Sequence, residues 1–267
     1  ALMRAGYPDH LHLKRGQIFN QALGGIDALR GRSSAERAVI KSYGDPALDR
    51  PTFNGNSSIA SCITVNTRSE PRYLLITDIA CKNFSSSGIE WKGRGSDIHL
   101  ENLSLTGTYQ NMSVFPVHDV QMTGRVLSNL TLRRSYLAGA RGARGQGLYM
   151  SSQHDSSQSP PTEPIHIRNV LIEENTFYDN GTAGSAQAHN LYIGAGARGV
   201  VIHNNISLNA ASHGLLSRAA GQILNNLIAK SGVGIQWGSG GLAQDGDCCD
   251  PLPSEPLTGD VEDNVLL

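Results

Sequence analysis

Short runs of alternating apolar and polar residues recur along the chain, and each run ends on a polar side chain at one turn position. Leu171-Ile-Glu-Glu-Asn175-Thr and Val201-Ile-His-Asn-Asn205-Ile are two of them. Aligning seven runs puts one polar residue of each in a single column: Asp78, Asn102, Ser135, Asn175, Asn205, Asn226 and Asn264. Successive column positions are 24, 33, 40, 30, 21 and 38 residues apart. The shortest unit therefore has 21–24 residues, and the longer steps carry additional loop.

A second motif of five residues follows each of the first six column positions. Its second and usually its fourth position are apolar, as in Gly147-Leu-Tyr-Met-Ser151. A period of two is typical of a half-buried β-strand. The six copies span residues 88–92, 111–115, 147–151, 190–194, 214–218 and 234–238. Both motifs keep the same phase, which an ordinary β-sandwich with Asn-rich turns would not require.

A unit of this length with two or three short strands cannot enclose a core alone. Stacking the units as coils of a solenoid gives each strand a parallel partner above and below. The recurrent Asn side chains can then hydrogen-bond along the stack and satisfy amides that would otherwise be buried without a partner. We therefore expect an all-β parallel solenoid forming a single domain over residues 1–267. Residues 1–60 should form less regular first coils, and residues 239–259 a long loop before a final coil.

The stacked coils resemble the right-handed parallel β-helix proteins of the pectate-lyase-like superfamily, and the resemblance extends over nearly the whole chain from Leu11. Within it, residues 189–194 followed by 212–218 are similar to a recurring pair in bacterial β-helix proteins without an assigned activity. The resemblance implies a right-handed parallel β-helix and, as functions, polysaccharide lyases, uronate epimerases, some glycoside hydrolases and phage tailspikes. Members usually cap the first coil with a helix. None is evident in this sequence, so we expect a truncated chain or a partner at that end.

Composition and charge narrow the choice of partner. The 267 residues include 30 Gly and 11 Pro, a turn density that favours many short strands. A formal net charge of -1 lacks the positive excess that is typical of proteins that bind nucleic acid or anionic lipid. The sequence contains no run of about 18 apolar residues and so predicts no membrane-spanning helix. We therefore expect a polysaccharide substrate or glycan as partner, and neither nucleic acid nor membrane, with the oligomeric state left open.

The second motif also predicts which side chains share one outer face. Position three reads Glu90, Ser113, Tyr149, Tyr192, Leu216 and Gln236 along the stack, and position five reads Lys92, Phe115, Ser151, Gly194, Arg218 and Gly238. Neighbouring coils lie about 4.8 Å apart. Tyr149, Tyr192 and Arg218 should therefore form one patch, bordered by His189 and His213 on neighbouring coils.

Three longer segments should wall this face and make it a groove for an extended polymer. They follow Ser151, precede His189 and follow Gly238. Loops on a rigid scaffold commonly carry binding residues. The candidate substrate-binding residues are Lys92, Phe115, His154, Glu90 and Gln236.

The patch favours lyase or C5-epimerase chemistry on a uronate-containing polysaccharide. Arg218 suits a carboxylate, and Tyr149, Tyr192, His189 or His213 could act as base or acid if their surroundings shift the pKa. A glycoside hydrolase instead needs two carboxylates flanking the bond. The patch offers Glu90 alone, with Asp155 and Asp179 in loops. The catalytic candidates are thus Tyr149, Tyr192, His189, His213 and Arg218.

Each candidate also has a structural interpretation. Tyr149 and Tyr192 could merely cover the sheet, or form a platform for sugar rings without catalysis. His189 and His213 could bond turn carbonyls, Arg218 could pair with Asp179 or Glu174, and Lys92 could be a solvated charge. The alternative functions are accordingly a non-catalytic glycan-binding or adhesin segment and a structural solenoid.

Metal and cysteine chemistry remain open from the sequence. No cofactor is expected, although the three carboxylates of Asp245, Asp247 and Asp250 make Ca²⁺ conceivable without the spacing of a calcium loop. Cys62 and Cys81 could form a disulfide between successive coils or be two buried small residues, and the adjacent Cys248 and Cys249 could form a vicinal disulfide. The proposed substrate predicts a secreted or periplasmic location.

Overall fold

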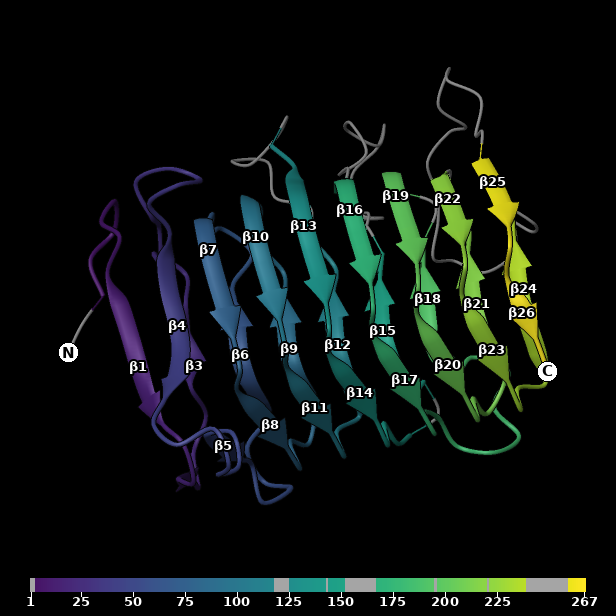
Figure 1. The fold of residues 1–267 in the computed structure, drawn as a ribbon, viewed down its shortest axis with the longest axis horizontal. Coiled ribbons are helices and arrows are strands. Elements are labelled where there is room, and N and C mark those ends of the chain that lie inside the picture. The colour runs from purple at the N-terminus through teal and green to yellow at the C-terminus, as the bar shows by residue number, and fades with distance from the viewer. Residues whose placement is uncertain are drawn as a thin grey trace.

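Three all-parallel sheets wind into a right-handed β-helix in the computed structural model, which describes residues 3–117, 125–142, 144–151, 167–194, 196–219, 221–238 and 259–267. Sheet A runs along the upper edge of Figure 1, sheet B along the lower edge and sheet C between them. The predicted all-β solenoid is confirmed. No helix occurs in the described ranges, so none there could span a bilayer.

Each sheet takes one strand from every coil. Sheet A contains β1 (His10–Lys14), β4 (Ala38–Tyr43), β7 (Arg72–Thr77), β10 (Gly95–Glu101), β13 (Leu127–Arg133), β16 (Ile167–Glu173), β19 (Ala197–His203), β22 (Gly221–Leu224) and β25 (Gly259–Glu262). Sheet B contains β2 (Ile18–Phe19), β5 (Thr52–Asn54), β8 (Ala80–Lys82), β11 (Ser104–Thr106), β14 (Tyr136–Ala138), β17 (Thr176–Tyr178), β20 (Ile206–Leu208), β23 (Leu227–Ala229) and β26 (Val265–Leu266). Sheet C contains β3 (Gly24–Gly25), β6 (Ser61–Val65), β9 (Ser87–Trp91), β12 (Gln110–Val114), β15 (Gln146–Met150), β18 (Leu191–Ile193), β21 (His213–Ser217) and β24 (Val233–Trp237). The residues before position 60, which the sequence predicted to be less regular, thus already form strands that pair with those of the next coil.

The core fills the interior of the helix with like side chains stacked on one another. Along sheet A, in-register strands place six buried aliphatic residues in one file: Ile76, Leu100, Leu132, Ile172, Ile202 and Ile223. Alternate positions of each strand point outward, as the period of two predicts. Because the apolar side chains of every coil pack on those of the adjacent coils, the core is continuous along the axis.

The predicted polar column exists, but it is shorter than the sequence indicated. Asn175 Nδ2 donates to Asn205 Oδ1 at 3.0 Å, Asn205 Nδ2 to Asn226 Oδ1 at 3.0 Å, and Asn226 Nδ2 to Asn264 Oδ1 at 2.9 Å. Ser135 begins the file, because its backbone N–H donates to Asn175 Oδ1 at 3.0 Å. These contacts satisfy amides inside the turn between sheets A and B.

The assignment of Asp78 and Asn102 to this column is wrong by one residue. Glu101 pairs with Arg133 in the sheet, so Asn102 lies level with Arg134, and Leu103 stands where Ser135 stands in the next coil. Asp78 is shifted in the same way, because Thr77 pairs with Glu101. Both residues have a positive φ, 58° and 52°, at the sharp end of the strand. Asn and Asp tolerate that backbone conformation better than most residues do.

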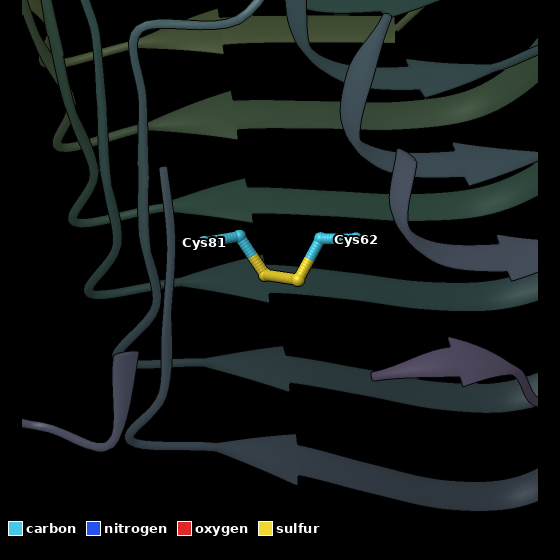
Figure 2. The surroundings of a disulfide bond; sticks show 2 residues. All are labelled: Cys62 and Cys81. Carbon is cyan, nitrogen blue, oxygen red and sulfur yellow. A yellow bond between two sulfur atoms is a disulfide. The ribbon is translucent and has the colours of Figure 1, made fainter. Parts of the chain in front are cut away.

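A disulfide joins Cys62 of β6 to Cys81 of β8 across the interior of the helix (Figure 2). Both residues are fully buried. Of the two alternatives that the sequence left open for this pair, the disulfide is therefore the one found. It links the sheet C strand of one coil to the sheet B strand of the next. Cys248 and Cys249 lie outside the described residues.

Candidate functional site

The outer face of sheet C carries a pocket of about 300 Å³ over β15, β18, β21 and β24. The predicted position-three column is in register, since Tyr149 pairs with Tyr192, Tyr192 with Leu216 and Leu216 with Gln236. The described residues that line the pocket are Arg144, Gln146, Tyr149, Ala186, Gln187, His189, Tyr192, His213, Leu216, Arg218 and Gln236. The fold thus brings all five catalytic candidates and Gln236 together.

Close approach between coils explains why glycine recurs at the first position of the motif. A Cβ on Gly147 would lie 2.5 Å from the carbonyl oxygen of Asn190 and 2.7 Å from Asn180 Nδ2. Asn180 Nδ2 itself donates to Asn190 Oδ1 at 2.8 Å. The missing side chain therefore leaves room for a buried amide ladder directly behind Tyr149, and that ladder fixes the strands that carry the pocket.

Aromatic rings form the floor of the pocket. The rings of Tyr149 and Tyr192 are stacked, with centroids 5.4 Å apart and planes 12° apart. His189 stacks on Tyr192 with ring centroids 5.7 Å apart and makes a T-shaped contact with His213, with centroids 4.8 Å apart. The Arg218 guanidinium carbon lies 5.8 Å from the centre of the Tyr192 ring. Tyr192 therefore contacts every other catalytic candidate except His213.

His189 is the most strongly perturbed group of the pocket. Its side chain is 4% exposed, and Nδ1 has no hydrogen-bond partner among the described residues. Burial, reinforced by His213 and Arg218, lowers the pKa of this imidazole to about 3. His189 is consequently uncharged near neutral pH, and its ring keeps one nitrogen able to accept a proton.

His213 is the second imidazole and is held by its neighbours. Its Nδ1 lies 2.8 Å from Ser212 Oγ. Burial lowers the pKa of His213, while a hydrogen bond with Gln236 acts in the opposite direction. The two histidines therefore differ in their surroundings: His213 is anchored by side chains, and His189 is enclosed by rings.

The charged side chains of the described pocket lining are positive. Arg144 and Arg218 both line it, and the described lining contains no Asp or Glu. Arg144 is oriented by a hydrogen bond from Nε to Gln187 Oε1, 2.8 Å long. Glu174 and Asp179, the carboxylates considered as partners of Arg218, instead pair with Arg134 and Arg141 at 2.7 Å each. The pocket is thus suited to an anionic ligand.

Three of the substrate-binding candidates lie outside the pocket, further along the same face of sheet C. Lys92 Nζ is 2.8 Å from Glu90 Oε1 and 5.4 Å from the centre of the Phe115 ring. The Phe115 ring lies 6.5 Å from that of Tyr149. Lys92 is therefore an ion-paired residue rather than a purely solvated charge. His154 lies outside the described residues.

Sequence reasoning missed Arg144, Gln146 and Gln187. Gln146 occupies the same column as His189 and His213, immediately before the motif, so extending the alignment by one position would have found it. Arg144 and Gln187 lie in turns of unequal length, where no register exists to align them. No cluster of three His, Cys, Asp or Glu side chains suited to a metal occurs within the described part of the chain. The acidic segment of Asp245 to Asp250 lies outside it.

Comparison with known proteins places the chain by its fold. No family model and no curated protein matches the sequence. Among solved structures, an alginate lyase from Paenibacillus sp. str. FPU-7 is similar with a TM-score of 0.58 and 16% identity, over 86% of this chain and 71% of that one. A GH136 lacto-N-biosidase from Eubacterium ramulus has a TM-score of 0.40 and 12% identity, over 97% of this chain and 62% of that one. A GH87 α-1,3-glucanase catalytic unit from Streptomyces thermodiastaticus strain HF3-3 has a TM-score of 0.30 and 13% identity, over 98% of this chain and 64% of that one. The predicted right-handed parallel β-helix is confirmed, and the similarity to the alginate lyase is a similarity of fold.

Proposed function

We propose that this protein is a carbohydrate-active β-helix that acts as a lyase or C5-epimerase on an acidic, uronate-containing polysaccharide. The observation that carries the proposal is the pocket on sheet C. It combines an uncharged buried imidazole, two stacked tyrosines and two guanidinium groups, with no carboxylate in its described lining. The similar fold of an alginate lyase is consistent with it.

The reaction begins with removal of the proton at C5 of the uronate. A guanidinium bound to the adjacent carboxylate stabilises the negative charge that the departing proton leaves on it. The neutral imidazoles of His189 and His213 are the bases of the pocket, and Tyr149 and Tyr192 bring hydroxyls able to donate a proton. In elimination, the C5 electron pair forms the C4–C5 double bond, the bond from C4 to the glycosidic oxygen breaks, and that oxygen takes a proton. In epimerisation, a proton returns to C5 from the opposite face.

Hydrolysis is less well supported by the same residues. Acid–base hydrolysis of a glycoside takes place between two carboxyl groups. Glu90 is the nearest carboxylate of the position-three column, two strands from Tyr149, and it is paired with Lys92. A proton-abstraction mechanism therefore uses the pocket better than hydrolysis does.

The buried disulfide supports a secreted or periplasmic location. Stable structural disulfides form in oxidising compartments and are rare in reducing ones. A polysaccharide substrate outside the cell agrees with that location.

The first test is turnover of alginate, pectate and glycosaminoglycans. Ultraviolet absorbance reports the unsaturated product of elimination, and proton NMR reports inversion at C5. We expect one polymer to be converted, and Arg218→Ala to reduce the rate at least about a hundredfold at an unchanged melting temperature. Arg168→Ala, an exposed arginine on sheet A, is the matched control and should leave the rate unchanged. No conversion by either readout across the panel would refute the proposal.

Glycan binding without turnover is the second candidate, favoured by the parallel stack of Tyr149 and Tyr192. Aromatic faces pack against the C–H faces of sugar rings. Binding on a glycan array together with no product in either assay would support this function, and Tyr192→Ala should then abolish binding.

A further inference from the structure

A second, larger pocket of about 490 Å³ opens on a different face, where sheet A turns into sheet B in the first coils. Residues 46–50, between β4 and β5, form one wall, and the outward side chains of β5, β8 and β11 form the floor. It shares no lining residue with the pocket on sheet C. The proposed reaction does not use it.

Asp78 organises the cationic side of this pocket. Its carboxylate accepts hydrogen bonds from Arg15 Nη2 and Ser42 Oγ, from Arg50 Nε at 3.1 Å and from Asn102 Nδ2 at 3.0 Å. Arg15 also donates from Nη1 to the carbonyl oxygen of Leu48 at 2.9 Å. Both guanidinium groups are thus held in place. Each has five N–H donors, so each keeps donors beyond those that the described residues accept.

Lys82 supplies a third cation on the floor. It lines the pocket opposite the wall, in register with Thr106 on the next coil. Its ammonium group has no carboxylate or hydrogen-bond partner in the described ranges. The described lining therefore contains three cations, Arg15, Arg50 and Lys82, against two carboxylates, Asp49 and Asp78.

Hydroxyls and exposed aromatic rings continue from the pocket along sheet B. Ser104 and Thr106 complete the floor, and Ser104 pairs with Tyr136 on the next coil. Tyr136 is 39% exposed, and Tyr178, one coil further, is 42% exposed. Along the helix axis Lys82 and Tyr136 are two coil spacings apart, about 10 Å, and their strand positions differ by two residues. An oligosaccharide can bridge this distance, whereas a single inorganic anion cannot.

We propose that this pocket is a second, non-catalytic binding site for a carboxylated oligosaccharide. Lys82 and the remaining donors of Arg15 and Arg50 hold a sugar carboxylate, Ser104 and Thr106 bond sugar hydroxyls, and Tyr136 packs against a following ring. The class of ligand rests on the proposed function, while the site itself does not. A polymer held at both faces gains avidity, because the first contact raises its effective concentration at the second.

The test is calorimetric titration with oligogalacturonate and oligomannuronate, using Arg218→Ala to weaken the sheet C pocket. We expect residual binding in that background. Adding Lys82→Glu should weaken it at least about tenfold, since a partly desolvated charge is reversed. Lys230→Glu is the matched control, because it makes the same charge change on an exposed residue just after β23, and it should leave affinity unchanged. Tyr136→Ala should weaken oligosaccharide binding, and neutral cello-oligosaccharide and inorganic sulfate should not compete.

Each outcome separates the two proposals. Loss of all binding in Arg218→Ala, or equal affinities for Lys82→Glu and Lys230→Glu, would overturn the second site while leaving the sheet C function intact. Sulfate binding as tight as that of the oligouronates would overturn the sugar ligand in favour of a simple anion. Lys82-dependent binding with no turnover by the wild-type protein would support the second site and refute the enzymatic function. Melting temperatures of all variants control for folding.

Discussion

At the scale of single residues, His189 shows how packing rather than charge pairing sets the chemistry of the sheet C pocket. Its imidazole contacts the rings of Tyr192 and His213, with Arg218 nearby. Enclosure by rings removes water from the imidazole, and the two basic neighbours oppose a further positive charge. The same surroundings that keep His189 neutral also leave Nδ1 without a described partner. A ligand that brings a carboxylate into the pocket would favour protonation of this ring.

The lowered pKa of His189 predicts a pH-dependent stability. Between pH 6.5 and the folded-state value of about 3, the unfolded chain binds a proton that the folded chain does not. Folding stability therefore falls with decreasing pH, by about 1.4 kcal/mol per unit for this group inside that window. His189→Gln should lose this part of the dependence in urea unfolding at pH 7 and pH 4.5. His12→Gln, on sheet A, is the control, and equal pH dependence in all three proteins would contradict the assignment.

The site was predictable where register holds and not where it fails. Tyr149, Tyr192 and Arg218 were found because strand alternation assigns each a column and a face. Arg144 and Gln187 were missed because the turns that carry them differ in length from coil to coil. A repeat pattern predicts neighbours only inside strands, since there the hydrogen-bonded ladder fixes the pairing.

At the scale of elements, the turn between sheets A and B explains the one error in the predicted alignment. Two adjacent turn positions favour similar residues for different reasons. The first has positive φ, which Asn and Asp tolerate, as at Asn204 with φ 56°. The second points inward and bonds along the stack, as at Asn205. An isolated Asn such as Asn102 therefore fits either position, and only the structure shows which one it occupies.

Substitutions at Asn204 and Asn205 should lower the free energy of unfolding by very different amounts. Asn205 is 4% exposed, accepts at Oδ1 from Asn175 and donates from Nδ2 to the carbonyl oxygen of Ile172 at 2.9 Å. Asn205→Leu leaves these buried groups without partners and should lower the free energy of unfolding by about 2–4 kcal/mol. Asn204→Gly keeps the positive φ on an exposed residue and should change it by less than about 0.5 kcal/mol. Chemical denaturation measures both, and similar losses would contradict the inward ladder.

At the scale of the whole molecule, stability is distributed along the helix axis. Each strand pairs only with strands of the two adjacent coils, so a local defect in the core should remain local. The fold class was predictable from the sequence because the same alternation of apolar and polar residues recurs in coil after coil. The disulfide was not, because a cysteine facing the interior serves equally well as a small apolar residue. Its partner depends on coil geometry that the pattern does not contain.

The disulfide therefore offers a direct measurement of how far a defect spreads. Cys62 and Cys81 close a loop with a sequence separation of 19, and removing the bond in Cys62→Ala/Cys81→Ala should cost about 3 kcal/mol through the unfolded state. We expect faster hydrogen exchange in β5, β6, β8 and β9, because β6 and β8 carry the two cysteines, β5 pairs with β8 and β9 pairs with β6. Exchange in β15, β18 and β21, and turnover at the sheet C pocket, should remain unchanged. Because both sulfurs are fully buried, reductant should not alter the folded wild-type protein. Uniformly faster exchange along the chain would instead mean that the coils unfold as one cooperative unit.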